Sequence, residues 1–424
     1  MKRWIFSVTL TLLFAIGAVS QPSVQKVQLL IIPDHADALY KIGEQIKFNI
    51  FALDCGLTLD NVTVDYEISE DLMPAYNTGS VILNGKNIIS AGNAKKPGYV
   101  RLKATVEHEG KKYSSMSTVG IEPEKLQPTV SLPEDFDKFW NKGLEQLKKV
   151  ELTPRMELLP ERCTDKVNVY HVSYGNIGGS RMYGMLTVPK EEGKYPAILR
   201  LPGAGVGAKG GDVKHATQGV IVLELGIHGI PVNMSDEIYK NLSTGVLSGY
   251  YVQNVENKDK YFYRRVYLGC VKGIDFLLSL PQCNGKVGTL GGSQGGALSI
   301  VTSRLDSRIS ATAVYFPAIS DTEGYVHGRA GGWPHVLKHK ENRTKEKIET
   351  MRYYDVANFA RELKAPVFFA YGYNDITCAP TTTRSVYNVI TAPKQLSIGE
   401  NTGHWLYPEQ VDAMWNWLIE ELNK

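Results

Sequence analysis

The chain has 424 residues, of which 43% are hydrophobic, and its 47 basic and 44 acidic side chains leave a formal net charge of only +3. This length exceeds one ordinary domain and supplies apolar side chains for two separate cores. The near balance of charge excludes the strongly basic surface of a nucleic-acid-binding protein, so no nucleic acid is expected among its partners.

The first residues have the three parts of a secretory signal peptide. Lys2 and Arg3 precede an apolar run that extends to Ala18. Small residues then offer a cleavage site before Gln21. The apolar run is shorter than the roughly 20 residues of a membrane-spanning helix. We therefore expect residues 1–20 to be removed on export, leaving no membrane span and a periplasmic or extracellular protein; an uncleaved membrane anchor is the alternative.

The segment 21–122 is predicted to form a small immunoglobulin-like β-sandwich. Polar and apolar side chains alternate in its short runs, and Gly and Asn turn residues separate the runs. The predicted strands are 27–32, 45–53, 61–68, 81–83, 99–109 and 112–120. No catalytic constellation occurs here, so we interpret this domain as a spacer or docking module; a contribution to the active-site wall is the alternative.

A change of composition at 123–132 predicts a linker between two domains. A helix is predicted to begin near Pro133, and strands over 166–174 and 182–188 follow it. Short apolar runs then alternate with helical stretches, which is typical of a mostly parallel sheet with helices on both faces. These runs are 197–201, 220–225, 287–290, 312–316, 367–371 and 395–398. We therefore predict an α/β domain over 133–424, with its ligand site at the carboxyl ends of the strands.

The strongest chemical signal is a Gly-x-Ser-x-Gly motif centred on Ser293, between an apolar strand and a helix. In a nucleophile elbow the serine adopts a strained conformation at a strand-to-helix turn, and small residues two positions away let strand and helix approach. Gly291 and Gly295 occupy those two positions. The motif alone also occurs in ordinary glycine-rich loops, but its flanking elements favour Ser293 as a catalytic nucleophile.

A serine hydroxyl needs a base, and in the α/β-hydrolase fold an acid and then a histidine follow the nucleophile along the chain. Asp375 comes just past the apolar run 367–371, and His404 lies in the last loop before a helix near Pro408. We predict that Asp375 orients His404 as the general base. A helix-capping or turn role is the alternative for Asp375.

The oxyanion that forms on attack needs backbone N–H donors already aimed at it. One donor should be Gln294, directly after the nucleophile, and the other Ala204, in the loop after the run 197–201. An ordinary glycine-rich loop is the alternative at Ala204. His228 and Trp333 lie in loops that could line the pocket, while Arg264 and Arg265 are expected to pair with carboxylates or pack on aromatic rings.

Five cysteines are too few and too scattered for a disulfide scaffold, and whether Cys270 and Cys283 pair stays open. None has the spacing of a zinc site, and no glycine-rich phosphate loop occurs, so no metal and no cofactor are expected. His335 and His339 stand four residues apart, as two ligands on a helix face do, but no third ligand accompanies them.

Several of these segments together resemble the acetyl xylan esterases and cephalosporin C deacetylases of the α/β-hydrolase superfamily, over about residues 131–424. The matching segments are 134–140, the Tyr-Arg-Arg-Val-Tyr stretch around Arg264, the Gly-Gly-Ser-Gln-Gly-Gly stretch around Ser293, and the surroundings of Asp375 and His404. The resemblance implies a cofactor-free serine esterase that removes acetyl groups from xylo-oligosaccharides or related glycans through an acyl-enzyme. It implies the same triad and oxyanion donors.

Three positions depart from the family pattern. Its usual His-Gly-Tyr is Pro202-Gly203-Ala204 here, its Arg-Gly-Gln stretch is replaced at 225–229, and a common Asp is Gly269. A different acyl pocket and alcohol site are therefore expected. The alternatives are another serine hydrolase of this fold, such as a peptidase or general carboxylesterase, and a non-catalytic glycan-binding protein. The added amino-terminal domain leaves homo-oligomeric assembly open.

Overall fold

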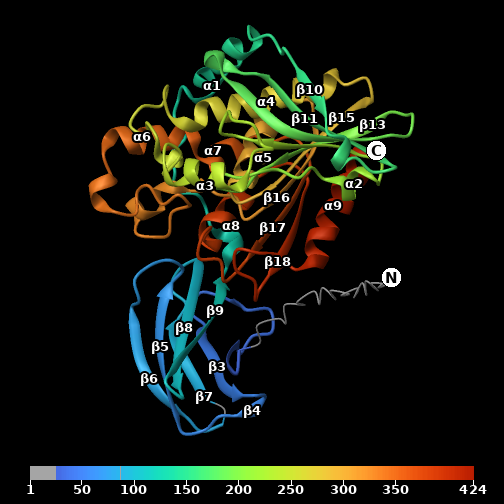
Figure 1. Cartoon of the computed structure of the whole chain (residues 1–424). Coiled ribbons are helices and arrows are strands. Elements are labelled where there is room, and N and C mark those ends of the chain that lie inside the picture. Colours follow the sequence, from blue (N-terminus) through green and yellow to red (C-terminus); the bar gives the residue numbers. More distant parts are fainter. Residues whose placement is uncertain (1–24, 86) are drawn as a thin grey trace, which may run out of the picture.

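The computed structural model describes residues 25–85 and 87–424, which form an amino-terminal β-region and a larger α/β region (Figure 1). The expected signal peptide, residues 1–20, lies outside the described residues. None of the helices in the described part of the chain combines the length and the hydropathy that a membrane crossing requires.

Strands β1 to β9 build two sheets in the amino-terminal region. One contains β1 (Val27–Pro33), β3 (Gln45–Asp54), β4 (Leu57–Thr58) and β7 (Asn87–Asn93); the other contains β2 (Leu39–Tyr40), β5 (Val62–Glu70), β6 (Asn77–Leu83), β8 (Gly98–His108) and β9 (Lys111–Ile121). Along β3 every second side chain is buried, and Phe48 and Ile50 belong to the same core as Val64 of β5 and Leu102 of β8. The predicted β-sandwich is confirmed.

The α/β region is built on a nine-stranded sheet with the order β10-β11-β12-β14-β13-β15-β16-β17-β18. The first four of these strands pair antiparallel and the remainder pair parallel. The strands are β10 (Arg155–Leu158), β11 (Val167–Gly175), β12 (Arg181–Pro189), β13 (Tyr195–Leu201), β14 (Ile221–Gly226), β15 (Cys283–Gly292), β16 (Ile309–Tyr315), β17 (Val367–Gly372) and β18 (Lys394–Gly399). The predicted mostly parallel sheet of an α/β-hydrolase is confirmed.

Helices cover both faces of this sheet. They are α1 (Phe136–Lys148), α2 (Val213–Ala216), α3 (Asp236–Thr244), α4 (Phe262–Ser279), α5 (Gln294–Leu305), α6 (Lys345–Tyr354), α7 (Val356–Ala360), α8 (Pro380–Val389) and α9 (Pro408–Leu422). Short 3-10 helices lie at Pro123–Lys125, Pro160–Arg162, Ile177–Gly179, Tyr250–Val252, Thr322–His327 and Lys340–Asn342. Phe369 of β17 packs in the core on the α5 side, whereas its neighbour Phe368 packs with Leu418 of α9 on the opposite face. Because successive side chains of a strand point to opposite faces of the sheet, one strand contributes to two separate cores.

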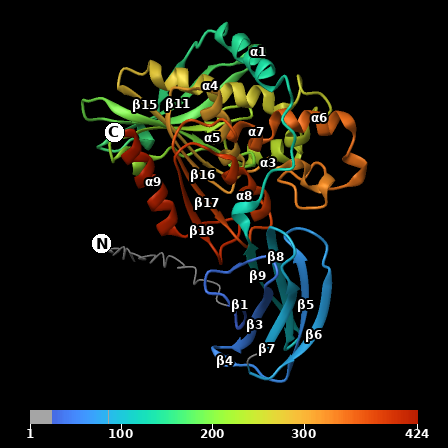
Figure 2. The same ribbon diagram turned by 180° about the vertical axis from the view of Figure 1, so that it is seen from behind.

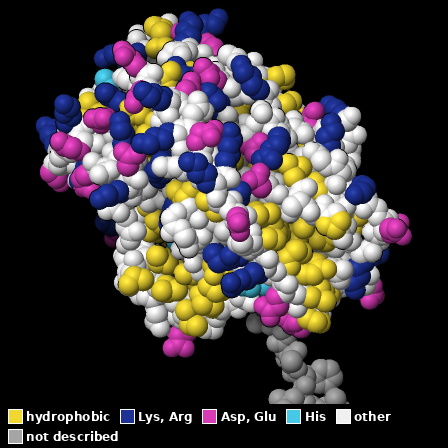
Figure 3. All heavy atoms as spheres, turned by 90° about the horizontal axis from the view of Figure 1, so that it is seen from above, with side chains coloured by type: hydrophobic (Ala, Val, Ile, Leu, Met, Phe, Trp, Pro, Cys, Tyr) yellow, Lys and Arg dark blue, Asp and Glu magenta, His cyan; other side chains and the backbone are white. Residues whose placement is uncertain are grey.

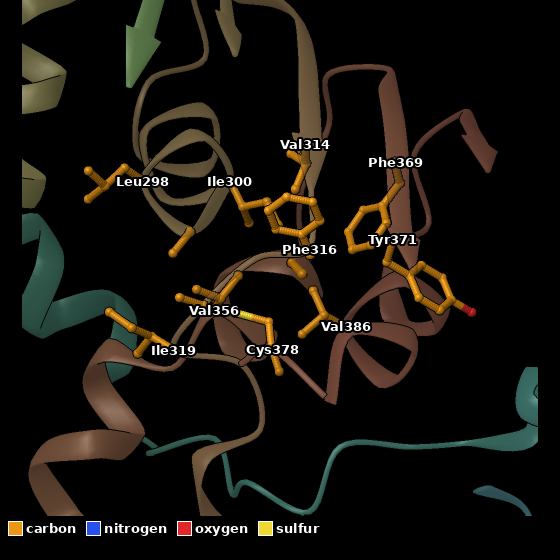
Figure 4. Close-up of a cluster of buried hydrophobic side chains, with 14 of the residues drawn as sticks. Leu298, Ile300, Val314, Phe316, Ile319, Val356, Phe369, Tyr371, Cys378 and Val386 are labelled. Carbon is orange, nitrogen blue, oxygen red and sulfur yellow. The ribbon is translucent and has the colours of Figure 1, made fainter. Parts of the chain in front are cut away.

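The core on the α5 side lies directly behind the carboxyl ends of β15, β16 and β17. Ile300 of α5 lies near Val314 of β16 there, and Leu298, Phe316 and Cys378 belong to the same cluster (Figure 4). Helix α1 begins at Phe136, three residues after the predicted start, because residues 134–135 form a turn before it. This core fixes the loops that carry the predicted site residues.

The β-sandwich meets the α/β region at α8 and the neighbouring end of β17, as the two opposite views show (Figures 1 and 2). On the face seen from above, Lys and Arg side chains are interspersed with Asp and Glu (Figure 3). That mixture agrees with the balanced charge of the sequence.

Candidate active site

Ser293 lies at the sharp turn between β15 and α5, with backbone angles φ 56° and ψ −124°. A positive φ is uncommon for a residue with a Cβ and marks local strain. A Cβ on Gly291 would come within 2.5 Å of the Gly295 backbone, and one on Gly295 within 2.2 Å of the Leu201 carbonyl oxygen. Both glycines are therefore needed for the close approach of strand and helix that presents the serine.

Asp375 and His404 are joined by a hydrogen bond of 2.7 Å between Oδ2 and Nδ1. The Asp375 side chain is fully buried, and its Oδ1 accepts the backbone N–H groups of Thr377 at 2.7 Å and Cys378 at 2.9 Å. The His404 side chain is 29% exposed. The carboxylate is thus held on both oxygens, while the imidazole stays open to a substrate.

The segment after β16 connects Ser293 to the imidazole. The backbone N–H of Ser293 donates to the Tyr315 carbonyl at 3.0 Å, and its own carbonyl accepts from the Ala318 N–H at 2.9 Å. Phe316 lies between Tyr315 and Ala318 along the chain, and its ring packs on the His404 ring with centroids 4.2 Å apart. The structure therefore brings the three predicted triad residues around one short segment.

Cys378 is a further residue of this site. Its backbone N–H donates to Asp375, and its thiol interacts with the Ser293 side chain. Burial and the nearby Asp375 carboxylate raise the pKa of the Cys378 thiol well above its ordinary value. The sulfur therefore stays a neutral thiol beside the hydroxyl. All five cysteines of the chain are free, Cys270 and Cys283 included.

The side chain of Gln294 ties the first turn of α5 to the loop after β13. Its Nε2 donates to the Pro202 carbonyl at 3.2 Å and the Gly203 carbonyl at 3.1 Å. Its Oε1 accepts the phenol groups of Tyr250 at 2.8 Å and Tyr263 at 2.7 Å. Burial raises the pKa of Tyr250 to about 12 and that of Tyr263 well above its ordinary value, so both phenols remain donors.

The same network reaches the two predicted oxyanion donors. Gln294 is the first residue of α5, and no carbonyl of its own helix accepts its backbone N–H. Next to Ala204, the Gly205 N–H donates to the Tyr250 hydroxyl at 3.1 Å and the Gly205 carbonyl contacts His228 Nε2 at 2.8 Å. Burial lowers the pKa of His228. Tyr250 and His228 therefore both hold the loop that carries Ala204.

Gln294→Glu is expected to lower kcat by about 10²-fold, the usual effect of losing an aligned oxyanion donor. A carboxylate cannot donate to the carbonyls of Pro202 and Gly203, so the loop should move away from α5. Steady-state kinetics on an aryl acetate measure the change. Tyr263→Phe is the matched control, because it removes one phenol from the same oxygen and leaves both loop bonds; equal losses in the two variants would contradict the argument.

Three of the remaining predicted positions, Trp333, Arg264 and Arg265, pack against aromatic rings. Trp333 packs against Tyr251, with ring centroids 5.0 Å apart, and both rings are half-buried near the site. Arg264 and Arg265 lie over the rings of Phe139 and Phe262, as expected of packing residues.

His335 and His339 do not share a helix face, because the 3-10 helix begins only at Lys340. The His335 Nδ1 is engaged with the Tyr325 hydroxyl and the Gly331 carbonyl, both at 3.0 Å.

One group of side chains far from the triad has the spacing of metal ligands. Asp54, His108 and Glu109 of the β-sandwich bring ligand atoms within 4.8 Å of one another. The Lys26 ammonium lies 2.7 Å from Glu109 and 3.6 Å from Asp54. A lysine thus already provides the positive charge there.

Comparisons with known proteins point to one family of esterases. The acetyl xylan esterase (AXE1) family matches residues 121–421. Acetyl esterase Axe7A of Xylanibacter ruminicola is 39% identical over 435 residues, which cover 100% of this chain and 97% of that protein. The structure of acetyl xylan esterase 1 from Thermoanaerobacterium sp. JW/SL YS485 matches with a TM-score of 0.61 at 22% identity, over 71% of this chain and 98% of that one. The acetyl xylan esterase of Paenibacillus sp. R4 matches with a TM-score of 0.61 at 25% identity, over 70% and 98%.

Proposed function

The chain belongs to the acetyl xylan esterase family and hydrolyses acetyl esters, and from this premise we propose that Ser293, Asp375 and His404 perform the reaction. The observation that carries the assignment is the 2.7 Å bond from a fully buried Asp375 to His404, at the loop edge where the elbow presents Ser293. Family membership favours ester hydrolysis over the peptidase and glycan-binding alternatives.

In the proposed acylation step, Ser293 Oγ bonds to the acetyl carbon while its proton passes to Nε2 of His404. The backbone N–H groups of Ala204 and Gln294 stabilise the oxyanion. The bond to the sugar oxygen then breaks, and the imidazolium gives its proton to that oxygen. In deacylation a water attacks the acetyl carbon and gives one proton to His404. The bond from that carbon to Ser293 Oγ then breaks, the imidazolium returns the proton to Oγ, and acetic acid leaves and ionises to acetate. Asp375 holds the imidazole in the tautomer that these transfers require.

Acetylated carbohydrates are the substrate class of this esterase, and we propose acetylated xylo-oligosaccharides or related glycans in particular. The half-buried rings of Tyr251 and Trp333, whose planes are tilted by 55°, offer an aromatic wall on which a sugar ring could pack against one ring face. The Trp333 carbonyl accepts the Ile319 N–H at 2.7 Å, one residue after the Ala318 N–H that bonds to Ser293. The backbone that carries Trp333 is therefore linked through residues 318–319 to the backbone of Ser293.

We further propose that the chain is exported and that its signal peptide is removed before Gln21. The mature protein would then consist of a β-sandwich domain to residue 122, a linker over 123–132 and a catalytic domain over 133–424. The basic start and short apolar run of the sequence support this proposal.

The substrate proposal is tested by acetate release from acetylated xylo-oligosaccharides, an aryl acetate and an aryl butyrate. Both acetates should be cleaved faster than the butyrate. Trp333→Ala should raise KM for the oligosaccharide by about two- to tenfold, the equivalent of the roughly 0.5–1.5 kcal/mol of a stacked ring pair, and leave the aryl acetate unaffected. Equal cleavage of butyrate, or an unchanged KM for the oligosaccharide, would count against this substrate assignment.

A further inference from the structure

Side chains of the β-sandwich reach across the domain boundary to the segment that carries Asp375. Arg101 of β8 is only 6% exposed, although it bears a charge. Its Nη2 donates to the backbone carbonyls of Tyr373 at 3.3 Å and Asp375 at 3.1 Å, and its Nε donates to Thr118 Oγ1 of β9 at 2.8 Å. A guanidinium of the amino-terminal domain thus binds the main chain of the catalytic acid itself.

A second contact holds the other end of the same segment. Helix α8 begins at Pro380, and its own N-cap residue, Ala379, provides no side-chain acceptor. Asp71, which is 2% exposed, accepts the backbone N–H of Thr381 at 3.0 Å as well as its hydroxyl. The β-sandwich therefore supplies the capping carboxylate of this helix, and a negative charge at a helix start is favourable.

The charge, burial and donor geometry of Arg101 explain why this side chain forms these contacts. Burial lowers the pKa of Arg101, and the nearby carboxylates of Asp71 and Asp375 counteract that effect. A guanidinium has donors in a fixed fork, so one side chain can hold two carbonyls and a hydroxyl in one geometry. The loop from Tyr373 to Thr381 is consequently fixed at its start by Arg101 and at its end by Asp71.

We propose that Arg101 is a positioning residue for the catalytic acid, so that the β-sandwich is a working part of the active site and not a detachable spacer or docking module. The proposal rests on the assignment of Asp375 given above. With the carbonyl of Asp375 fixed, its carboxylate stays directed at His404. Without Arg101, two buried carbonyls lose their donor and the loop relaxes, and a misplacement of about 1 Å in such a site can cost about 10²-fold in rate.

The test compares Arg101→Met, Arg101→Lys and Tyr99→Phe in the full-length protein. Tyr99 contacts the Tyr371 hydroxyl at 2.7 Å across the same boundary, and its ring packs edge-on against Tyr373 with centroids 5.2 Å apart. Phenylalanine keeps this ring packing and removes only the hydroxyl, so Tyr99→Phe is the matched control. For an aryl acetate, Arg101→Met should lower kcat by about 10- to 100-fold with KM unchanged. Arg101→Lys should recover part of kcat, and Tyr99→Phe should keep the wild-type value.

A spectroscopic signal separates positioning from general destabilisation. The Nδ1 proton of His404, shared with Asp375, should give a far-downfield proton resonance in wild type and in Tyr99→Phe, and this resonance should be lost or displaced in Arg101→Met. If Arg101→Met does not fold, Arg101→Lys decides, because it keeps the positive charge beside Asp71. Wild-type kcat in folded Arg101→Met would overturn the proposal. If only Arg101→Lys folds, wild-type kcat in that variant would overturn it. Activity retained by Asp375→Asn would instead overturn the triad assignment.

Discussion

Replacing Ser293 with alanine is expected to abolish acetate release, with a loss in kcat on the order of 10⁵- to 10⁶-fold, as for other triad nucleophiles. No acyl-enzyme can form without the Oγ atom, and the oxyanion donors alone leave only a small residual rate. Alanine has the same backbone constraints as serine at φ 56°, so the turn should persist. Acetate release and covalent labelling by an organophosphonate, followed by mass spectrometry, measure the effect.

Ser303→Ala is the matched control for this experiment. Ser303 lies on the same helix, α5, and its buried hydroxyl has no hydrogen-bond partner among the described residues. The control should retain both activity and labelling. Phosphonate labelling that persists in folded Ser293→Ala would refute Ser293 as the nucleophile.

Asp375→Asn is expected to lower kcat by about 10⁴-fold while leaving the fold intact. The two backbone N–H groups of Thr377 and Cys378 both point at one oxygen, so the amide oxygen of asparagine takes that place and its NH₂ group faces His404. An NH₂ group can only donate, which forces the imidazole into the tautomer with a proton on Nε2. That tautomer cannot accept the proton of Ser293.

The comparison of kcat for Asp375→Asn with its thermal unfolding midpoint separates catalysis from stability. The mutated side chain keeps its volume and its two N–H contacts, so the midpoint should stay within a few degrees of wild type. A kcat loss below tenfold would show that another group orients His404.

The central strands of the sheet could be predicted, and the triad could be proposed, because each depends on a local pattern. Apolar runs marked the central strands, and the order of Ser293, Asp375 and His404 along the chain selected one histidine of nine. Strand β10 was missed because all its side chains are exposed at a sheet edge, so it shows no alternation. Strand β7 was missed because Ile88 is 61% exposed, so its neighbouring Ile88 and Ile89 break the polar–apolar alternation of the sequence although Ile89 and Ala91 are buried in turn.

The contacts that hold the site in place could not be predicted in the same way. Arg101 occurs within an alternating strand, where a basic residue ordinarily faces solvent, and Gln294 was singled out only for its backbone. Tyr250 and Tyr263 resemble ordinary core aromatics. Their partners lie 31 to 274 residues away along the chain, and no local signal specifies such pairings.

The contacts between the β-sandwich and the loop carrying Asp375 also bear on how the protein is made. Arg101 and Asp71 leave the ribosome early, whereas their partners follow 274 and 310 residues later. Domains generally fold as units in the order of their synthesis, so the amino-terminal sheets form while both charged groups still face water. The loop carrying Asp375 can be fixed only after α8 has emerged. The proposed base, His404, follows later still, so esterase activity should appear only after α8 and the last loop have both been synthesised.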